Sequence, residues 1–293
     1  MKYLIIVLAV LSFAKPALAE RLSLMNEFEL SPQLYNGTRS VQGEFLPMGW
    51  IGNCTGTAVG PGTIFTAAHC VRHGSTITFT PRYNGQQYRM ICSRHSRYNT
   101  RTVFNDYAIC RLTSGRFPES MPLASFEFRT PAVGERLLLN GYGAPTVRVH
   151  HWGPETVTRH GNQDIVTCGR VYLGGGDSGG SLLAWAADRS GRSGFKVLGV
   201  NSRSDRRSCS YFNRTNHPEF RSWAEGYETA TGEQLCGLSI ECTGSDPEPD
   251  PDPEPDPEPI NCRKVYEEFE FCLGTSGVDG CILRADQLKK CVE

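Results

Sequence analysis

The sequence predicts an all-β domain, either a sandwich or a barrel, over about residues 34–242. Short apolar runs of strand length recur along this region, and they are rich in Val, Thr and aromatic residues. Gly, Pro and Asn interrupt these runs at frequent intervals, which is typical of turns. No long helical period occurs before residue 218, so alternating strands and helices of a parallel sheet are not expected.

Six runs are the clearest predicted strands. They are Cys54–Val59, Thr63–Ala68, Thr76–Thr80, Asp106–Leu112, Arg136–Asn140 and Lys196–Val200. One helix is predicted over Pro218–Glu228, because four apolar residues recur at the spacing of a single helical face. These residues are Phe220, Trp223, Ala224 and Tyr227.

Residues 1–19 have the features of a signal peptide. Lys2 precedes an apolar run that is too short to span a bilayer, and Ala17-Leu18-Ala19 matches a signal-peptidase site. The mature chain is expected to begin at Glu20. We therefore expect a secreted protein, extracellular or periplasmic, with no membrane span.

Composition limits the classes of partner. Hydrophobic residues make up 39% of the 293 residues and charged residues 21%, which is the range of globular proteins with a core. The formal net charge of −1 provides no overall field that would attract nucleic acid, so no nucleic-acid partner is expected. The 12 cysteines of an exported chain indicate disulfides, with zinc as the weaker alternative.

An acidic, Pro-rich linker is predicted over residues 243–260. Residues 246–259 alternate Asp or Glu with Pro, and proline at every second position prevents both helix and sheet. The expected structure is a polyproline II spacer, roughly 40 Å long at about 3.1 Å per residue.

Residues 261–293 are predicted to form a small cysteine-rich helical hairpin. Nine residues separate Cys262 from Cys272, and nine separate Cys281 from Cys291. Two short helices joined by disulfides Cys262–Cys291 and Cys272–Cys281 satisfy this symmetry, and so short a module needs such links. The spacing resembles the twin CX9C hairpin. The module has two equally favoured roles: it docks to a substrate or surface, or it serves as a stabilising cap.

Three short motifs contain residues of the types that act in catalysis. They are Thr66-Ala67-Ala68-His69-Cys70, Asn105-Asp106-Tyr107-Ala108-Ile109 and Gly176-Asp177-Ser178-Gly179-Gly180. Each alone has an ordinary structural explanation, such as a turn cap or a glycine-rich loop. Together they supply a hydroxyl nucleophile, a base of suitable pKa and a carboxylate that orients the base.

The order of these motifs resembles the trypsin/chymotrypsin family of serine proteases, in its compact, secreted bacterial type. The resemblance covers roughly Leu34–Tyr227 and extends to Asn140–Gly143 and to Gly199–Ser202. The latter resembles the strand whose Ser helps to hold the triad Asp and whose backbone pairs with substrate. It implies two antiparallel six-stranded β-barrels with a C-terminal helix, and a peptidase of protein or peptide substrates without metal or cofactor. It further implies His69 as base, Asp106 as orienting acid, Ser178 as nucleophile, and the N–H groups of Gly176 and Ser178 as oxyanion hole.

The resemblance also implies an activation step. Family zymogens expose a new N-terminus whose ammonium pairs with the Asp before the nucleophile, here Asp177. Leu34 occupies the place of that N-terminus, so residues 20–33 are expected to be a propeptide. Gln33 precedes the cut, which predicts an activating enzyme other than trypsin. The alternative is an ordinary N-terminal extension.

The predicted substrate pocket departs from that of trypsin. Tyr172 stands where trypsin has an Asp, six residues before the nucleophile, with Leu173 next to it. The opposite wall is predicted to be Ser202-Arg203-Ser204, without the usual glycine. These residues favour an apolar or small side chain, although Asp205 leaves basic specificity open. A narrowed pocket also suits a catalytically inactive binding or adhesion protein of the same fold.

Disulfides are the last expectation. The family resemblance implies Cys54–Cys70. The pairings Cys168–Cys209, Cys92–Cys110 and Cys236–Cys242 are hypotheses, since connectivity does not follow from sequence. His150, His151 and His160 are interpreted as solvent-exposed loop residues and not as a metal site, because no carboxylate cluster accompanies them.

Overall fold

The computed structural model describes residues 34–41, 43–143, 149–187 and 193–242. The predicted signal peptide, propeptide, acidic linker and helical hairpin lie outside these residues, as do Cys262, Cys272, Cys281 and Cys291. None of the helices in the described ranges is long and apolar enough to cross a membrane.

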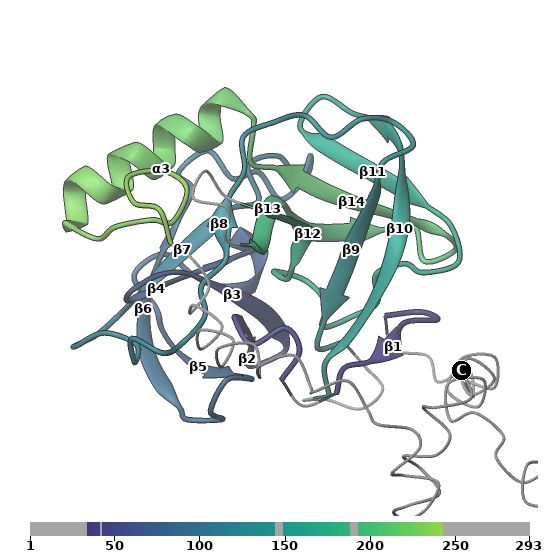
Figure 1. Cartoon of the computed structure of the whole chain (residues 1–293). Coiled ribbons are helices and arrows are strands. Elements are labelled where there is room, and N and C mark those ends of the chain that lie inside the picture. Colours follow the sequence, from purple (N-terminus) through teal and green to yellow (C-terminus); the bar gives the residue numbers. More distant parts are fainter. Residues whose placement is uncertain (1–33, 42, 144–148, 188–192, 243–293) are drawn as a thin grey trace, which may run out of the picture. The chain divides into compact units, whose positions relative to one another are not determined.

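The first barrel is a closed sheet of six strands in the order β2-β3-β4-β7-β6-β5 (Figure 1). The strands are β2 (Met48–Ile51), β3 (Cys54–Gly60), β4 (Thr63–Thr66), β5 (Thr76–Pro81), β6 (Tyr88–Arg94) and β7 (Ala108–Leu112). Every pairing in this barrel is antiparallel. Its interior is filled by buried apolar side chains that include Ile64, Phe79 and Met90.

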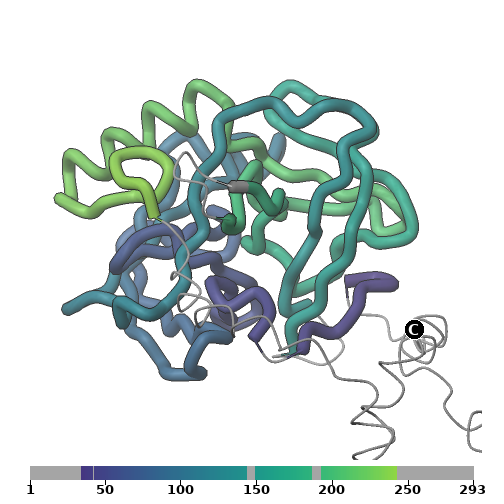
Figure 2. The backbone as a smooth tube through the Cα atoms, in the orientation of Figure 1, coloured from purple at the N-terminus to yellow at the C-terminus, as the bar shows by residue number. Residues whose placement is uncertain are grey.

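The second barrel also has six strands, because β9 pairs with both β10 and β12 and so closes the sheet. Its strands are β9 (Arg136–Gly141), β10 (His151–His160), β11 (Asp164–Cys168), β12 (Ser181–Ala187), β13 (Ser193–Ser204) and β14 (Cys209–Arg214). Two short strands join its edges: β1 (Thr38–Arg39) pairs with β10, and β8 (Ser125–Phe126) runs parallel to β13. Figure 2 shows the N-terminal end of the described chain against this barrel. The prediction of two antiparallel six-stranded barrels is confirmed.

Helix α3 (Pro218–Thr231) confirms the predicted C-terminal helix and extends it by three residues. The His217 side chain accepts the Glu219 N–H at the start of the helix. Gly232 ends the helix in the left-handed conformation, with φ of 71°, which glycine adopts without steric cost. Phe220, Ala224 and Tyr227 are buried as the helical spacing predicts.

One hydrophobic cluster connects both barrels and α3. It contains Phe65 and Ile109 from the first barrel, Leu183 and Val197 from the second, and Phe220 from the helix. Because packed interiors are dense and resist deformation, this shared cluster holds the two barrels in a defined relation at their seam.

The described cysteines form the four disulfides Cys54–Cys70, Cys92–Cys110, Cys168–Cys209 and Cys236–Cys242. Each is a pairing that was predicted or hypothesised above. Cys92–Cys110 and Cys168–Cys209 join directly paired residues of neighbouring strands.

The prediction that the histidines near residue 150 are solvent-exposed is wrong for His150 and His151, which are buried, and His160 is half-buried. His151 and His160 are the first and last residues of β10, and His150 directly precedes this strand. The His150 ring is enclosed by Phe45 and Tyr142, and its Nδ1 hydrogen-bonds with Ser40 Oγ at 2.5 Å. Burial holds the pKa of His150 well below its usual value.

Candidate active site

His69 lies on a single turn of 3-10 helix, η1 (Ala68–Cys70), which follows β4 directly. The predicted strand Thr63–Ala68 therefore ends earlier, at Thr66. The ring Nδ1 of His69 is 2.8 Å from Asp106 Oδ2, and the backbone N–H of His69 donates to Asp106 Oδ1 at 2.9 Å. A carboxylate at Nδ1 favours the tautomer that carries its proton there, which leaves Nε2 free to accept a proton.

Asp106 is fully buried in front of β7. Ser202 donates a hydrogen bond of 2.6 Å to Asp106 Oδ2, so this oxygen has two partners. The Asp106 N–H donates to Asn213 Oδ1 at 2.8 Å. The predicted role of Ser202 beside the triad acid agrees with this geometry, whereas sequence reasoning missed Asn213.

The residue before Asp106 is held by the second barrel. Asn105 has a left-handed backbone with φ of 55°, and its N–H donates to Gln163 Oε1 at 2.8 Å. The Gln163 amide in turn donates to Asn105 Oδ1 at 3.3 Å. Reciprocal amide contacts of this kind compensate for a sparsely populated conformation of a non-glycine residue. Gln163 carried no motif by which the sequence could have identified it.

The loop that carries Ser178 is held against strand β3 by Thr55. The Thr55 N–H donates to the Ser178 carbonyl at 2.8 Å, and the Thr55 hydroxyl donates to the Gly176 carbonyl at 3.0 Å. Gly179 has φ of 83°, and a Cβ at this position would lie 2.1 Å from Thr66 Oγ1. Glycine is therefore required for the nucleophile loop to approach the end of β4, where His69 follows.

The two backbone N–H groups expected to form the oxyanion hole, those of Gly176 and Ser178, donate no hydrogen bond within the described residues. Ser178 is half-buried. In this part of the chain the Ser178 hydroxyl also has no hydrogen bond to His69. Catalytic hydrogen bonds are often long in unliganded proteins and shorten only when substrate is bound.

Asp177, next to Ser178, points inward and is fully buried. Its carboxylate accepts the Gly143 N–H and the Gly174 N–H, both at 2.8 Å. Burial raises the pKa of Asp177 to about 6, because the two N–H groups compensate only in part for lost hydration. Leu34 is fully buried among the core residues of the second barrel.

The predicted pocket residues have different surroundings. The Tyr172 ring stacks on Tyr35, with 4.3 Å between ring centroids. Leu173 is 3% exposed and packs in the core of the second barrel. Ser204 pairs with Ser210 across β13 and β14.

The charged residues on the opposite wall are already engaged. Arg203 forms an ion pair of 2.6 Å with Asp164. Asp205 Oδ1 accepts the backbone N–H groups of Arg207, Ser208 and Cys209, each at 2.9 Å. This carboxylate caps its own turn, so the hypothesis that it reaches the pocket is not supported by its contacts.

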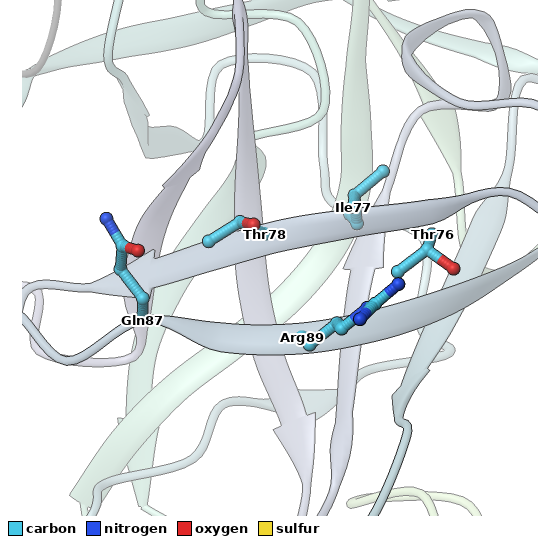
Figure 3. A pocket seen from close by; sticks show the side chains of 5 residues that line it. All are labelled: Thr76, Ile77, Thr78, Gln87 and Arg89. Atoms are coloured by element: carbon cyan, nitrogen blue, oxygen red, sulfur yellow. The ribbon is translucent and has the colours of Figure 1, made fainter.

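Two further features of the described residues resemble binding sites: a cluster of metal-ligating side chains and a pocket. Nitrogen and sulfur atoms of His69, Cys54 and Cys70 lie within 4.8 Å of one another, but the two sulfurs form a disulfide and carry no thiolate. An open pocket lies on the hairpin of β5 and β6, between Thr76–Thr78, Gln87 and Arg89 (Figure 3). None of the triad residues lines it.

The protein belongs to the class of two-barrel β proteins. The Asp106–His69 pair and the Ser178 loop lie where its two barrels meet. The model of the family described as Trypsin matches residues 35–224, and the chain belongs to this family. Among curated proteins no sequence match was found.

Solved structures of similar fold include human heparin binding protein, at 20% sequence identity and a TM-score of 0.53, over 69% of this chain and 99% of that one. An atomic-resolution structure of HBP matches with the same identity and coverage and a TM-score of 0.54. A double mutant of human heparin binding protein (CAP37) matches with a TM-score of 0.55, also at 20% identity and the same coverage. At this identity the likeness concerns the fold alone.

Proposed function

We propose that the chain is a secreted serine endopeptidase that hydrolyses peptide bonds through an acyl-enzyme intermediate. The observation that carries the proposal is the doubly held pair of Asp106 and His69, with contacts of 2.8 and 2.9 Å, beside a glycine-dependent loop that presents Ser178. A buried carboxylate at Nδ1 is the arrangement that a general-base histidine requires.

In this mechanism, His69 Nε2 accepts the Ser178 proton as the hydroxyl oxygen attacks the scissile carbonyl. The oxyanion that forms is stabilised by the N–H groups of Gly176 and Ser178, which have no competing acceptor among the described residues. His69 then donates the proton to the leaving amine, and the acyl group stays on Ser178. A water molecule, deprotonated by His69, then attacks the acyl carbonyl, the bond from this carbon to Ser178 Oγ breaks, and His69 returns the proton to Oγ as the acid leaves.

Activation by cleavage before Leu34 is part of the proposal. A buried carboxylate without a cation is costly, and the raised pKa of Asp177 expresses this cost. An ammonium released at Leu34 would pair with Asp177, which would stabilise its ionised form. Gln33 before the cut argues for an activating enzyme that is not trypsin.

The pocket is proposed to take an apolar or small side chain of the protein or peptide substrate. Support comes from the segment between Cys168 and Gly176, which contains no acid, and from Asp205, which caps a turn. The hairpin module at residues 261–293 is proposed to dock to a substrate or surface, since its helices would provide a separate binding face.

The test is labelling of the full exported chain by a fluorophosphonate probe, before and after removal of residues 20–33. We expect labelling of the processed protein and none of the Ser178→Ala variant. Ser193→Ala, at the exposed start of β13, is the matched control and should label normally. Processed protein that folds but stays unlabelled would contradict the proposal.

The second candidate is a non-catalytic binding or adhesion protein on the same scaffold. The missing hydrogen bond between the described side chains of Ser178 and His69 favours it, and one fold serves many functions. A processed protein without labelling or cleavage of casein would support this candidate.

A further inference from the structure

Two arginines and a tyrosine form a row across the second barrel. Arg159 of β10 pairs with Val166 of β11, Val166 pairs with Tyr211 of β14, and Tyr211 pairs with Arg203 of β13. Directly paired residues of antiparallel strands present their side chains to the same face. The Arg203 guanidinium lies 4.7 Å from the Tyr211 ring centroid and that of Arg159 lies 5.7 Å from it.

This row carries more positive charge than its own carboxylate neutralises. Asp164 is 5% exposed and accepts two hydrogen bonds from Arg203, at 2.6 Å to Oδ2 and 3.4 Å to Oδ1, while Oδ1 also accepts the Asn213 amide at 2.9 Å. Arg159, in contrast, is exposed and contacts the ring and hydroxyl of Tyr211. The Arg203 side chain is 32% exposed, so both guanidinium groups retain N–H donors toward solvent.

The row begins one residue from the catalytic machinery. Ser202, which donates to Asp106, immediately precedes Arg203. Asn213 accepts the Asp106 N–H and donates to Asp164, so a continuous set of hydrogen bonds joins the triad acid to the row.

The strand beside the row has a free edge. In the described chain β13 pairs with β12 as far as Val200, and the Asn201 backbone then bonds Gly179 and Gly180, whereas β13 pairs with β14 as far as Ser204. The open edge is therefore confined to Ser202–Ser204. An extended peptide adds to such an edge through backbone hydrogen bonds, and its side chains then meet the residues on either face. Peptide side chains that turn to the face of the row would lie beside Arg203, whose guanidinium shares the Tyr211 ring with that of Arg159.

We propose that Arg203 and Arg159 select peptides that carry Asp or Glu within four residues of the scissile bond. The inference rests on the proposed peptidase function and specifies its substrate class. A carboxylate placed over the row accepts charge-assisted hydrogen bonds from two guanidinium groups, which are stronger than those between neutral partners. The isosteric Asn and Gln lose this charge while keeping their shape.

The test separates binding from hydrolysis. A library of decapeptides, each position carrying Asp or Asn in otherwise matched sequences, is cleaved by the processed wild-type protein, and the products are sequenced by mass spectrometry. The same library is retained on immobilised Ser178→Ala protein. We expect Asp over Asn by about tenfold at one or more positions in both experiments, and a smaller ratio at 1 M salt.

Variants assign the preference to the row. Arg203→Gln and Arg159→Gln should each reduce the Asp/Asn ratio at least threefold, while Arg203→Lys should keep part of it. Arg159→Gln tests the row without a loss of folding stability, because it leaves the ion pair of Arg203 with Asp164 intact. Arg221→Gln is the matched control, since Arg221 also lies over an aromatic ring, that of Phe128, but on α3.

The outcomes distinguish the two proposals. Equal recovery of Asp and Asn peptides by cleavage and by binding would overturn the selection of acidic substrates, even if Ser178 is labelled. An Asp preference in binding to Ser178→Ala, with no labelling of wild type, would overturn the peptidase function and keep the acidic subsite. A ratio unchanged in both arginine variants would overturn the assignment to this row.

Discussion

The Ser202 hydroxyl donates a 2.6 Å hydrogen bond to Asp106 Oδ2, the same carboxylate oxygen that lies 2.8 Å from His69 Nδ1. Asp106 is fully buried, so its charge depends on these protein donors and on the His69 backbone N–H for stabilisation. The second barrel therefore supplies, through Ser202, part of the electrostatic environment of a pair that belongs to the first.

Ser202→Ala should lower kcat/KM of the processed protein by about 10–100-fold, because a hydrogen bond to a charged group contributes about 1.5–3 kcal/mol. The fall should appear in kcat, since the hydroxyl contacts the triad acid. Steady-state kinetics on a quenched-fluorescence peptide measures it, with Ser193→Ala as the control. An unchanged kcat would exclude an electrostatic role for Ser202.

Asp177 should make the intact chain less stable as pH rises from about 4 to 6. The pKa of Asp177 is about 6 in the folded protein and 3.8 ordinarily, so the folded state binds the proton more tightly than the unfolded state. This contribution to the free energy of unfolding is lost as the carboxylate ionises. The shift corresponds to about 3 kcal/mol. Thermal unfolding from pH 4 to 7 measures it against Asp177→Asn, which does not titrate. Parallel stability curves for the two proteins would contradict this account.

Gly179→Ala should abolish labelling of Ser178 by a fluorophosphonate. The new Cβ would lie 2.1 Å from Thr66 Oγ1 and 2.4 Å from the Thr55 carbonyl oxygen, so the nucleophile loop would have to move. Gly194→Ala is the matched control, because no atom lies within 4 Å of a Cβ there. Normal labelling of Gly179→Ala would mean that the loop tolerates the displacement.

Asn213→Ala should destabilise the protein by about 1–3 kcal/mol, because the Asp106 N–H is buried and loses its acceptor. Asp164 loses a donor in the same variant. Urea unfolding measures the loss, with Asn216→Ala, whose amide bonds Thr130 at the surface, for comparison. Equal stability of the two variants would show that the contact contributes little.

The barrels, the helix and the Cys54–Cys70 disulfide were predictable because each has a local or motif-based signal, whereas the other three described disulfides were hypotheses. Short runs with turn residues indicated strands, the spacing of Phe220, Ala224 and Tyr227 indicated α3, and the motifs around His69 and Ser178 indicated the disulfide at Cys54–Cys70. One predicted strand extends too far, to Ala68, whereas β4 ends at Thr66. Another begins too early, at Asp106, whereas β7 begins at Ala108. His69 and Asp106 therefore lie just outside the sheet.

The supporting residues could not be predicted, because their contacts depend on strand register. Gln163, in the turn before β11, and Asn213, in β14, reach Asn105 and Asp106 from more than 50 residues away in sequence. Counting back from Ser178 identified Tyr172, but it gave no sign that the ring stacks on Tyr35. An offset in sequence says nothing of the face to which a side chain turns.

Thr55 links the two halves of the chain at the candidate active site. Thr55 belongs to the first half of the chain, yet its amide and hydroxyl hold carbonyls of the loop in the second half. A nascent polypeptide that ends before residue 178 carries His69 and Asp106 without Ser178, and a fragment of the second half carries Ser178 without them. On the proposed peptidase function, neither half alone would hold the complete triad, so peptide cleavage would require both halves of the chain to be folded together.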